Sequence, residues 1–213
     1  MGTGIGFGKV ILFNEHFVVY GLPAIASAIG SRTTALVERR SGSGVEINDE
    51  RPETEGYKAE KASQQKESLD LMLNFMKVDT KNNAFRVALA GDLLAASGVG
   101  ASAASCAAIA RAFSDALGLN FTDDRVNEVA YEGEKGYHGT PSGIDNTAAT
   151  YGGLIWYKRE GSLHQMERMK LKRPVEIVMG NTGLVADTKA VVGAVKVRKE
   201  KDPEKYAGIF QER

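Results

Sequence analysis

Residues Ala95 to Ala104 read AASGVGASAA, a glycine-containing turn that leads directly into a predicted helix of small residues from Ala101 to Leu117. Gly98 and Gly100 permit tight, left-handed backbone turns. The first N–H groups of a helix have no partner within it and lie at the positive end of its dipole, so they attract phosphate. From this loop alone, a phosphate site and a plain glycine turn before a helix are equally good interpretations.

The loop differs from the two commonest phosphate motifs. A Walker loop would close with Gly-Lys followed by Ser or Thr, and a Rossmann fingerprint would need a third glycine at a fixed spacing. Neither pattern is present here. Ser97 and Ser102 nevertheless supply hydroxyl groups that can bond to phosphate oxygens or to a metal ion.

The elements expected around this helix predict an α+β fold. Strands are expected at Lys9–Phe13, Ala24–Ile29, Thr33–Glu38, Val45–Asn48, Ala84–Ala90, Leu154–Tyr157 and Val175–Met179. Helices are expected at Glu67–Lys77, Ala101–Leu117, from Thr122 or Asp123 to about Lys135, at Thr188–Lys199 and after Asp202. Residues 51–66 show no periodicity. Early strands and later helices in mixed order favour α+β over a regularly alternating parallel sheet.

Composition excludes some classes of function. The chain of 213 residues has 27 Lys and Arg against 27 Asp and Glu, which argues against a general nucleic-acid binder. No apolar run approaches the roughly 20 residues that span a bilayer, and the first residues lack the pattern of a signal peptide. We therefore expect a cytoplasmic protein without nucleic-acid or membrane partners. The single cysteine, Cys106, lies in an alanine-rich run and is expected in the core.

Four segments together resemble the GHMP kinase superfamily and, within it, the mevalonate kinases. They are GKVILFNEHFVVYG (Gly8–Gly21), SGVGASAA (Ser97–Ala104), GTPSGIDNTAATYGG (Gly139–Gly153) and GNTGLVADTKAVV (Gly180–Val192). The resemblance covers nearly the whole chain, and the segments occur in the family's order. It implies a two-domain GHMP-kinase architecture: residues 1–170 would form an ATP-binding N-terminal domain like ribosomal protein S5 domain 2, and residues 171–213 would begin the C-terminal domain.

The resemblance also implies roles for individual residues. Lys9 matches the family's active-site lysine and Asp145 its proton-accepting aspartate, while Glu15 and His16 match the substrate-binding pair. Matches to ATP- and phosphate-binding positions are Ser97, Gly98, Val99, Gly100, Ala101, Ser102, Ala103 and Thr188, and matches to magnesium ligands are Ser102 and Glu134.

The chemistry of these residue types agrees with the implied roles. Magnesium prefers oxygen ligands and keeps several waters, so Ser102 and Glu134 suffice as protein ligands. Asp145 would accept a proton from the attacking hydroxyl, and Lys9 would hold that carboxylate ionised. Taken singly, each residue has a structural alternative: Asp145 could cap a turn, and Glu134 could form a solvated pair with Lys135.

The activity that the resemblance implies is phosphorylation of the primary hydroxyl of mevalonate by ATP with Mg²⁺, giving 5-phosphomevalonate for isoprenoid precursor synthesis. Galactokinases tend to follow the Glu-His pair with Thr-Asp, whereas this chain continues with the apolar residues 17–20, which favours mevalonate. The alternatives are another GHMP kinase, acting on phosphomevalonate or a sugar, and an inactive or binding-only relative. The expected partners are mevalonate and ATP, and a homodimer stays open.

The sequence departs from the family at several positions. Phe7 stands where proline is common, Asn14 where glycine usually precedes Glu-His, and Ala101 where the loop has a second serine. A side chain at Asn14 is expected to crowd the site. The family's late glycine-rich segment would lie beyond Arg213, so we expect the chain to be the N-terminal two-thirds of a longer kinase, with doubtful activity alone.

Overall fold

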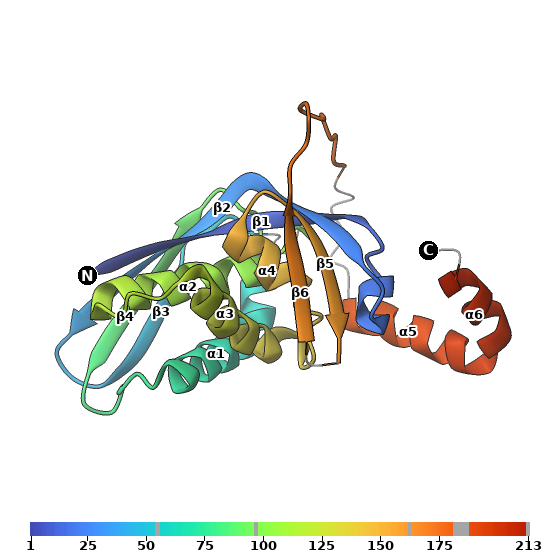
Figure 1. The fold of residues 1–213 in the computed structure, drawn as a ribbon. Coiled ribbons are helices and arrows are strands. Elements are labelled where there is room, and N and C mark those ends of the chain that lie inside the picture. The colour runs from blue at the N-terminus through green and yellow to red at the C-terminus, as the bar shows by residue number, and fades with distance from the viewer. Residues whose placement is uncertain (54–55, 96–97, 162, 181–187, 212–213) are drawn as a thin grey trace.

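A computed structural model describes residues 1–53, 56–95, 98–161, 163–180 and 188–211, the last range without the side chains of 188–190 (Figure 1). The strands are β1 (Gly2–Phe13), β2 (Ala24–Arg40), β3 (Gly44–Asp49), β4 (Ala84–Gly91), β5 (Leu154–Glu160) and β6 (Leu163–Met169). The helices are α1 (Tyr57–Met76), α2 (Ala101–Leu117), α3 (Asp123–His138), α4 (Ile144–Tyr151), α5 (Thr188–Lys201) and α6 (Pro203–Gln211), with a 3-10 turn η1 (Phe17–Tyr20).

The long strand β2 is the centre of the sheet. Along one of its edges β1 pairs antiparallel, and along the other edge β4 pairs with its second half and β5 with its first half, also antiparallel. β3 joins β4 in parallel, and β6 joins β5 antiparallel, which gives the order β3-β4-β2-β5-β6 with β1 beside β2. This mixed sheet with packed helices confirms the α+β prediction.

Small residues allow α2 to lie directly on β1. Gly2, Gly4 and Gly6 alternate along β1 and therefore share one face of the strand. A Cβ atom at Gly6 would lie 2.0 Å from the carbonyl oxygen of Ala104, and one at Gly4 would lie 2.2 Å from that of Ala108. These glycines thus fix how closely the first turns of α2 approach the sheet.

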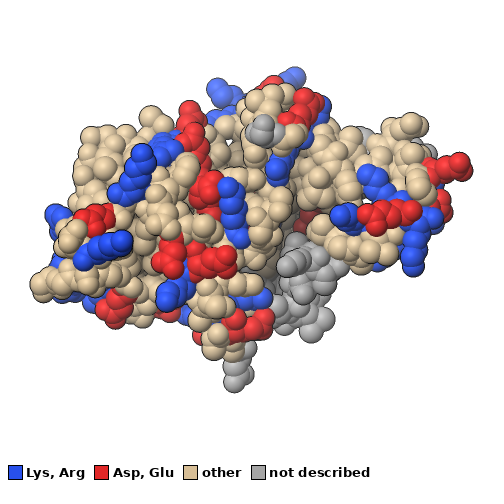
Figure 2. All heavy atoms as spheres, turned by 90° about the horizontal axis from the view of Figure 1, so that it is seen from below, with Lys and Arg blue, Asp and Glu red and all other residues tan. Residues whose placement is uncertain are grey.

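The main core lies between the sheet and the helices. Leu69, Met72, Leu73 and Met76, the predicted apolar face of α1, are all buried together with Cys106 on α2. The core predictions for this helix face and for the cysteine are confirmed. On the surface seen in Figure 2, basic and acidic side chains are interspersed, in agreement with the balanced composition.

Several element predictions were wrong. Residues 57–66 form the first half of α1, although their sequence shows no helical periodicity, because none of them is buried and they have no apolar face to reveal the helix. The two strands predicted at 24–29 and 33–38 are one strand, β2. Residues 175–179, predicted as a strand, have neither helical nor strand structure and are exposed, and α4 and β6 were not predicted.

The helices α5 and α6 extend away from the sheet near η1 (Figure 1). Phe210 of α6 makes edge-to-face contacts with Phe17 and Tyr20 of η1, at ring-centroid distances of 5.0 and 4.9 Å. Lys199 of α5 lies over the same two rings, Tyr20 and Phe210. Among the helices described, none combines the length and hydrophobicity that a bilayer crossing requires.

Candidate active site

Lys9 connects β1 to residues 98–100, the described part of the glycine loop that precedes α2. Its backbone N–H donates to the carbonyl of Val99 at 2.8 Å, while its side chain is 7% exposed and reaches towards α4. There its Nζ lies 3.0 Å from Oδ1 of Asp145. Gly100 precedes α2 with φ 74°, and a Cβ atom at that position would lie 2.8 Å from Cγ of Lys9. Glycine at this position therefore lets the loop cross directly over the lysine stem.

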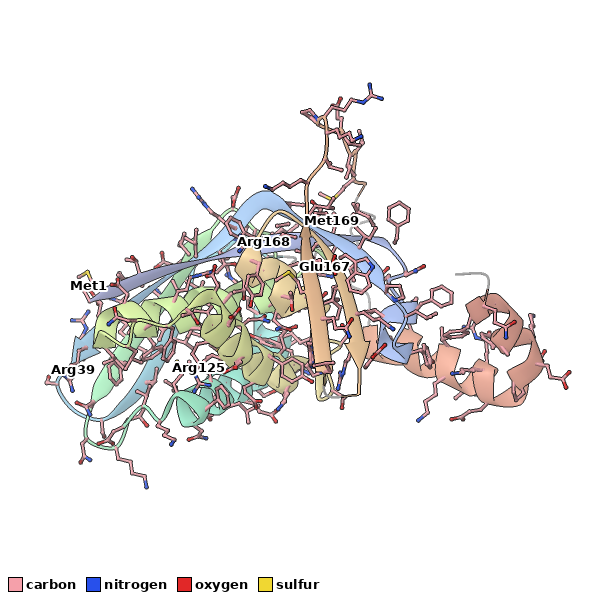
Figure 3. The ribbon with its side chains drawn as sticks, viewed as in Figure 1. Met1, Arg39, Arg125, Glu167, Arg168 and Met169 are labelled. Carbon is pink, nitrogen blue, oxygen red and sulfur yellow. The ribbon has the colours of Figure 1, made fainter. Side chains whose placement is uncertain are left out.

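Strands β5 and β6 hold the turn that presents Asp145 in the first turn of α4. The buried Tyr157 on β5 donates its hydroxyl to the carbonyl of Ser142 at 2.7 Å, and the same oxygen lies 2.6 Å from Nδ1 of His164 on β6. Gly143 has φ 93°, and a Cβ atom there would lie 2.3 Å from the Tyr157 hydroxyl. The tyrosine thus fixes the backbone immediately before the aspartate. In Figure 3 the labelled residues on β6 mark this strand, which lies beside β5.

Glu134 is a buried carboxylate close to the start of α2. It is 1% exposed, its Oε2 lies 3.7 Å from Nε2 of His138, and its Oε1 has no hydrogen-bond partner among the described residues. Burial, followed by the nearby charge of Asp145, raises the pKa of Glu134 to about 8, although a hydrogen bond from Ser102 and the charge of Lys9 oppose this rise. A buried oxygen without a partner beside a glycine loop is a position suited to a cation.

The residues present fit magnesium better than a metal held only by protein. The described residues contain no group of three or more His, Cys, Asp or Glu side chains that could hold a metal ion. Glu134 and Ser102 provide one carboxylate and one hydroxyl, hydrogen-bonded to each other. Magnesium commonly takes one or two carboxylates and completes its shell with water and phosphate oxygens. A cation would also offset the cost of an ionised carboxylate in this buried position.

Lys9 is the cation among these carboxylates. Burial by itself would lower the pKa of Lys9, but the charge and hydrogen bond of Asp145, followed by the charges of Glu15 and Glu134, outweigh burial and raise that pKa above its ordinary value. Lys9 is therefore charged at neutral pH, and the Lys9–Asp145 pair is an ion pair.

The segment after β1 carries the predicted substrate-binding pair. Glu15 is exposed and His16 is partly buried, directly before η1. Asn14, at the position where the family has glycine, adopts φ 65°, and its Nδ2 donates to the carbonyl of Pro23 at 2.9 Å. Asparagine is one of the few residues that tolerates this left-handed conformation. The departure at Asn14 thus keeps the backbone geometry of glycine, and the side chain bonds to backbone.

The predicted phosphate-binding residues fall partly inside the described chain. Gly98 adopts φ 75° and is exposed, Gly100 is the residue before α2, and residues 101–103 form the first turn of α2. Ser97 lies outside the described residues, and Thr188 opens α5 with its side chain not described. The roles of Ser97 and Thr188 therefore stay predictions.

Two supporting groups were not predicted. Tyr157 was expected only as core, because the apolar run around it indicates burial and says nothing about its hydroxyl partner at Ser142. Arg51 lies in a stretch without periodicity, yet it is 5% exposed and hydrogen-bonded to the carbonyl of Ala101 in the first turn of α2. A buried arginine in a polar segment leaves no sequence signal, since polar segments are usually exposed.

Comparison with known proteins identifies the class to which this fold and site belong. The family described as "GHMP kinases N terminal domain" matches residues 66–153. The curated mevalonate kinase of Pyrococcus furiosus is 34% identical over 220 residues, covering 95% of this chain and 64% of the relative. The mevalonate kinase of Mus musculus is 27% identical over 259 residues, with the same coverage. The comparison therefore places residues 66–153 in the GHMP kinase N-terminal domain family.

Within that family, the chain is similar to mevalonate kinases. A crystal structure of L. major mevalonate kinase in complex with R-mevalonate superposes with a TM-score of 0.85 and 38% identity over 99% of this chain and 65% of the other. A Lin0012 protein from Listeria innocua, at 18% identity and a TM-score of 0.75, shares the fold. The chain spans 64% of the length of the Pyrococcus furiosus relative and 62% of the length of a second archaeal mevalonate kinase.

Proposed function

We propose that this chain carries the nucleotide-binding and catalytic residues of a kinase that transfers a phosphoryl group from ATP to the primary hydroxyl of mevalonate. The observation that carries the proposal is the Lys9–Asp145 ion pair, 3.0 Å long, at the junction of the glycine loop and α2. A charged lysine, an aspartate that can accept a proton and a helix N-terminus are the parts that phosphoryl transfer requires.

The residues act in the proposed reaction by binding, orienting and moving one proton. The N–H groups of the loop and the first turn of α2 bind phosphate oxygens, and Lys9 offsets negative charge as it develops. The substrate hydroxyl gives its proton to Asp145 as its oxygen bonds to the terminal phosphorus, and the bond from that phosphorus to ADP breaks. Magnesium, when bound, neutralises phosphate charge. Glu134 and Ser102 are the residues that would hold it.

The choice of mevalonate rests on sequence similarity and on the segment after β1. The L. major relative is named as a complex with R-mevalonate, and the curated relatives are named mevalonate kinases. In this chain Glu15 and His16 precede the apolar turn η1. A partly buried imidazole can donate a hydrogen bond to a hydroxyl or carboxylate of the substrate, and its apolar surroundings suit a methyl-bearing chain.

We further propose that residues 1–170 form the N-terminal domain and that residues 171–213 begin a second one. Residues 1–169 contain the whole described sheet and helices α1 to α4. In the later part, several large apolar side chains are exposed; they are Val175, Ile177, Val178, Met179, Val191 and Val197. Exposed apolar residues of this kind are covered when a domain is completed. Limited proteolysis should then cut first between Met169 and α5.

Loss of the proposed magnesium ligands should raise the magnesium requirement. Glu134→Gln and Ser102→Ala each remove one oxygen ligand, and we expect each to raise the magnesium concentration needed for half-maximal ADP binding about tenfold, as for loss of a bond to a charged group. Isothermal titration calorimetry with ADP at increasing magnesium measures this. Glu132→Gln on α3, where Glu132 pairs with Lys135 at the surface, is the control and should overlay the unmodified chain.

The same titration should depend on pH. Without a cation Glu134 is protonated at neutral pH because its pKa is raised to about 8, and magnesium binds only the ionised form. Magnesium affinity should therefore rise as pH increases towards that pKa, and this rise should disappear in Glu134→Gln. A magnesium titration that is unchanged in both Glu134→Gln and Ser102→Ala would contradict the metal assignment.

Substrate preference tests the choice of mevalonate. We expect mevalonate to give a higher kcat/KM than galactose, homoserine or phosphomevalonate in a coupled ADP assay. His16→Leu should raise the KM for mevalonate about tenfold by removing a hydrogen bond to a charged substrate, and leave the KM for ATP nearly unchanged. Val19→Ala, a change at an exposed position of the same segment, is the control. A higher kcat/KM for any of the other three substrates would overturn the assignment.

A further inference from the structure

A buried charged pair lies under the first turn of α2. Arg51, which follows β3, is 5% exposed and binds both carboxylate oxygens of Asp49: its Nε lies 2.9 Å from Oδ1 and its Nη2 lies 2.6 Å from Oδ2. Burial by itself would raise the pKa of Asp49, but the hydrogen bonds and charge of Arg51 outweigh it and hold that pKa below its ordinary value. Both members of the pair are therefore charged at neutral pH.

The remaining guanidinium nitrogen connects the sheet to α2. Nη1 of Arg51 donates to Oγ1 of Thr33 on β2 at 3.3 Å, to the carbonyl of Ala101 at 3.0 Å and to Oγ of Ser105 at 2.5 Å. Ser105 in turn donates its hydroxyl to the carbonyl of Ala101 at 2.7 Å. Thr33 is 0% and Ser105 1% exposed, so these two hydroxyl partners of Arg51 are buried. The planar guanidinium group of Arg51 thus joins the central strand β2 to the first turn of α2, which follows the glycine loop.

The network also borders the proposed nucleotide site. Arg51 lines a small cavity together with Ala101 and Ser102, and Ser102 is a proposed ligand of phosphate and magnesium. The bonded carbonyl belongs to the residue between Gly100 and Ser102. Two glycines with positive φ make the loop intrinsically free to move, so an external contact is needed to hold its N–H groups in one geometry.

We propose that Arg51 is a positioning residue that holds the glycine loop and the first turn of α2 in their phosphate-binding geometry. Asp49 orients the guanidinium, and Thr33 and Ser105 complete its hydrogen bonds. The proposal deepens the proposed function and rests on it for the identity of the ligand. Lysine cannot replace Arg51, because one ammonium group cannot reach the carboxylate of Asp49 and the start of α2 at the same time.

The same helix offers a matched control. Arg111, further along α2, also makes three hydrogen bonds to different elements: to the carbonyl of Ile5 at 2.7 Å, to Oδ1 of Asp123 at 2.6 Å and to the carbonyl of Thr150 at 2.8 Å. Arg51→Lys and Arg111→Lys therefore make the same chemical change to a multiply bonded arginine, and only the first lies next to the loop. Both variants are expected to lower the melting temperature.

Nucleotide affinity separates positioning from stability. For magnesium with a non-hydrolysable ATP analogue, measured by calorimetry, we expect Arg51→Lys to weaken binding about tenfold, and Arg111→Lys to stay within about twofold of the unmodified chain. Mevalonate affinity should be unchanged in both variants. Equal nucleotide affinity in the two variants would overturn the positioning role.

A second readout needs no nucleotide. Amide hydrogen exchange over residues 98–105 should become faster in Arg51→Lys and in Ser105→Ala, a smaller change that leaves the Asp49 pair intact, but not in Arg111→Lys. If the unmodified chain bound no nucleotide, the proposed function would be wrong, while the positioning role would still be decided by exchange. Unchanged exchange in Arg51→Lys and in Ser105→Ala would overturn the positioning role.

Discussion

Asp145→Asn is expected to reduce turnover by ~10²–10⁴-fold, the usual cost of losing a general base, while nucleotide binding persists. Asparagine has nearly the shape of aspartate but cannot accept the proton of the attacking hydroxyl. It also removes the partner of Lys9 at 3.0 Å, so the buried lysine loses the largest of the interactions that raise its pKa. The Tyr157 bond to Ser142 does not involve the carboxylate and should keep the turn in place.

The measurement is release of ADP with mevalonate, in this chain or in a longer version that contains it, together with calorimetry of nucleotide binding. Asp70→Asn, a change of the same kind at an exposed position of α1, is the control and should leave turnover unaffected. Turnover of Asp145→Asn within about twofold of the unmodified protein would remove Asp145 from the catalytic role, because loss of a general base costs far more.

Gly6→Ala is expected to lower the free energy of unfolding by about 3 kcal/mol, the upper range for overpacking a well-packed interface. A Cβ atom at Gly6 would lie 2.0 Å from the carbonyl oxygen of Ala104, and that atom belongs to the backbone of α2. The helix must therefore shift, and no side-chain rotation can relieve the overlap. Since Ala104 lies in the first turns after the glycine loop, nucleotide binding should weaken as well.

Gly30→Ala is the matched control for this change. Gly30 lies on β2, its φ is not positive, and a Cβ atom there would have nothing within 4 Å. Chemical unfolding monitored by circular dichroism should show a large loss of stability for Gly6→Ala and a change below about 0.5 kcal/mol for Gly30→Ala, as for surface substitutions. Similar midpoints for the two variants would mean that β1 and α2 are not packed as closely as described.

Much of the fold followed from local patterns in the sequence. The helix at 101–117 was predicted with its correct bounds, because its small residues, the glycines before it and Gly118 after it all specify the same ends. Thr122 accepts a hydrogen bond from the N–H of Arg125 and caps α3 as one of the two predicted caps. The resemblance to GHMP kinases, carried by four short segments, was confirmed by comparison.

Other segments were missed or wrongly predicted because their local sequence gives no pattern or a misleading one. The first half of α1 is polar and contains no buried residue, so it lacks the apolar periodicity by which helices are recognised. Residues 175–179 have strand-like composition, yet they pair with no described strand and stay exposed, since β-propensity alone does not form a sheet.

The amino-acid sequence alone determined which residue types are available for catalysis: Lys9, Asp145, Glu134 and the glycines around Ser102, in the order of the GHMP kinases. Only the tertiary structure decided the hydrogen-bond partners and the pKa values of these residues. Burial by several elements leaves an oxygen of Glu134 without a partner and raises its pKa to about 8, and close approach puts Lys9 against Asp145. The physical reason is that desolvation and charge interactions depend on distances between residues far apart in the sequence.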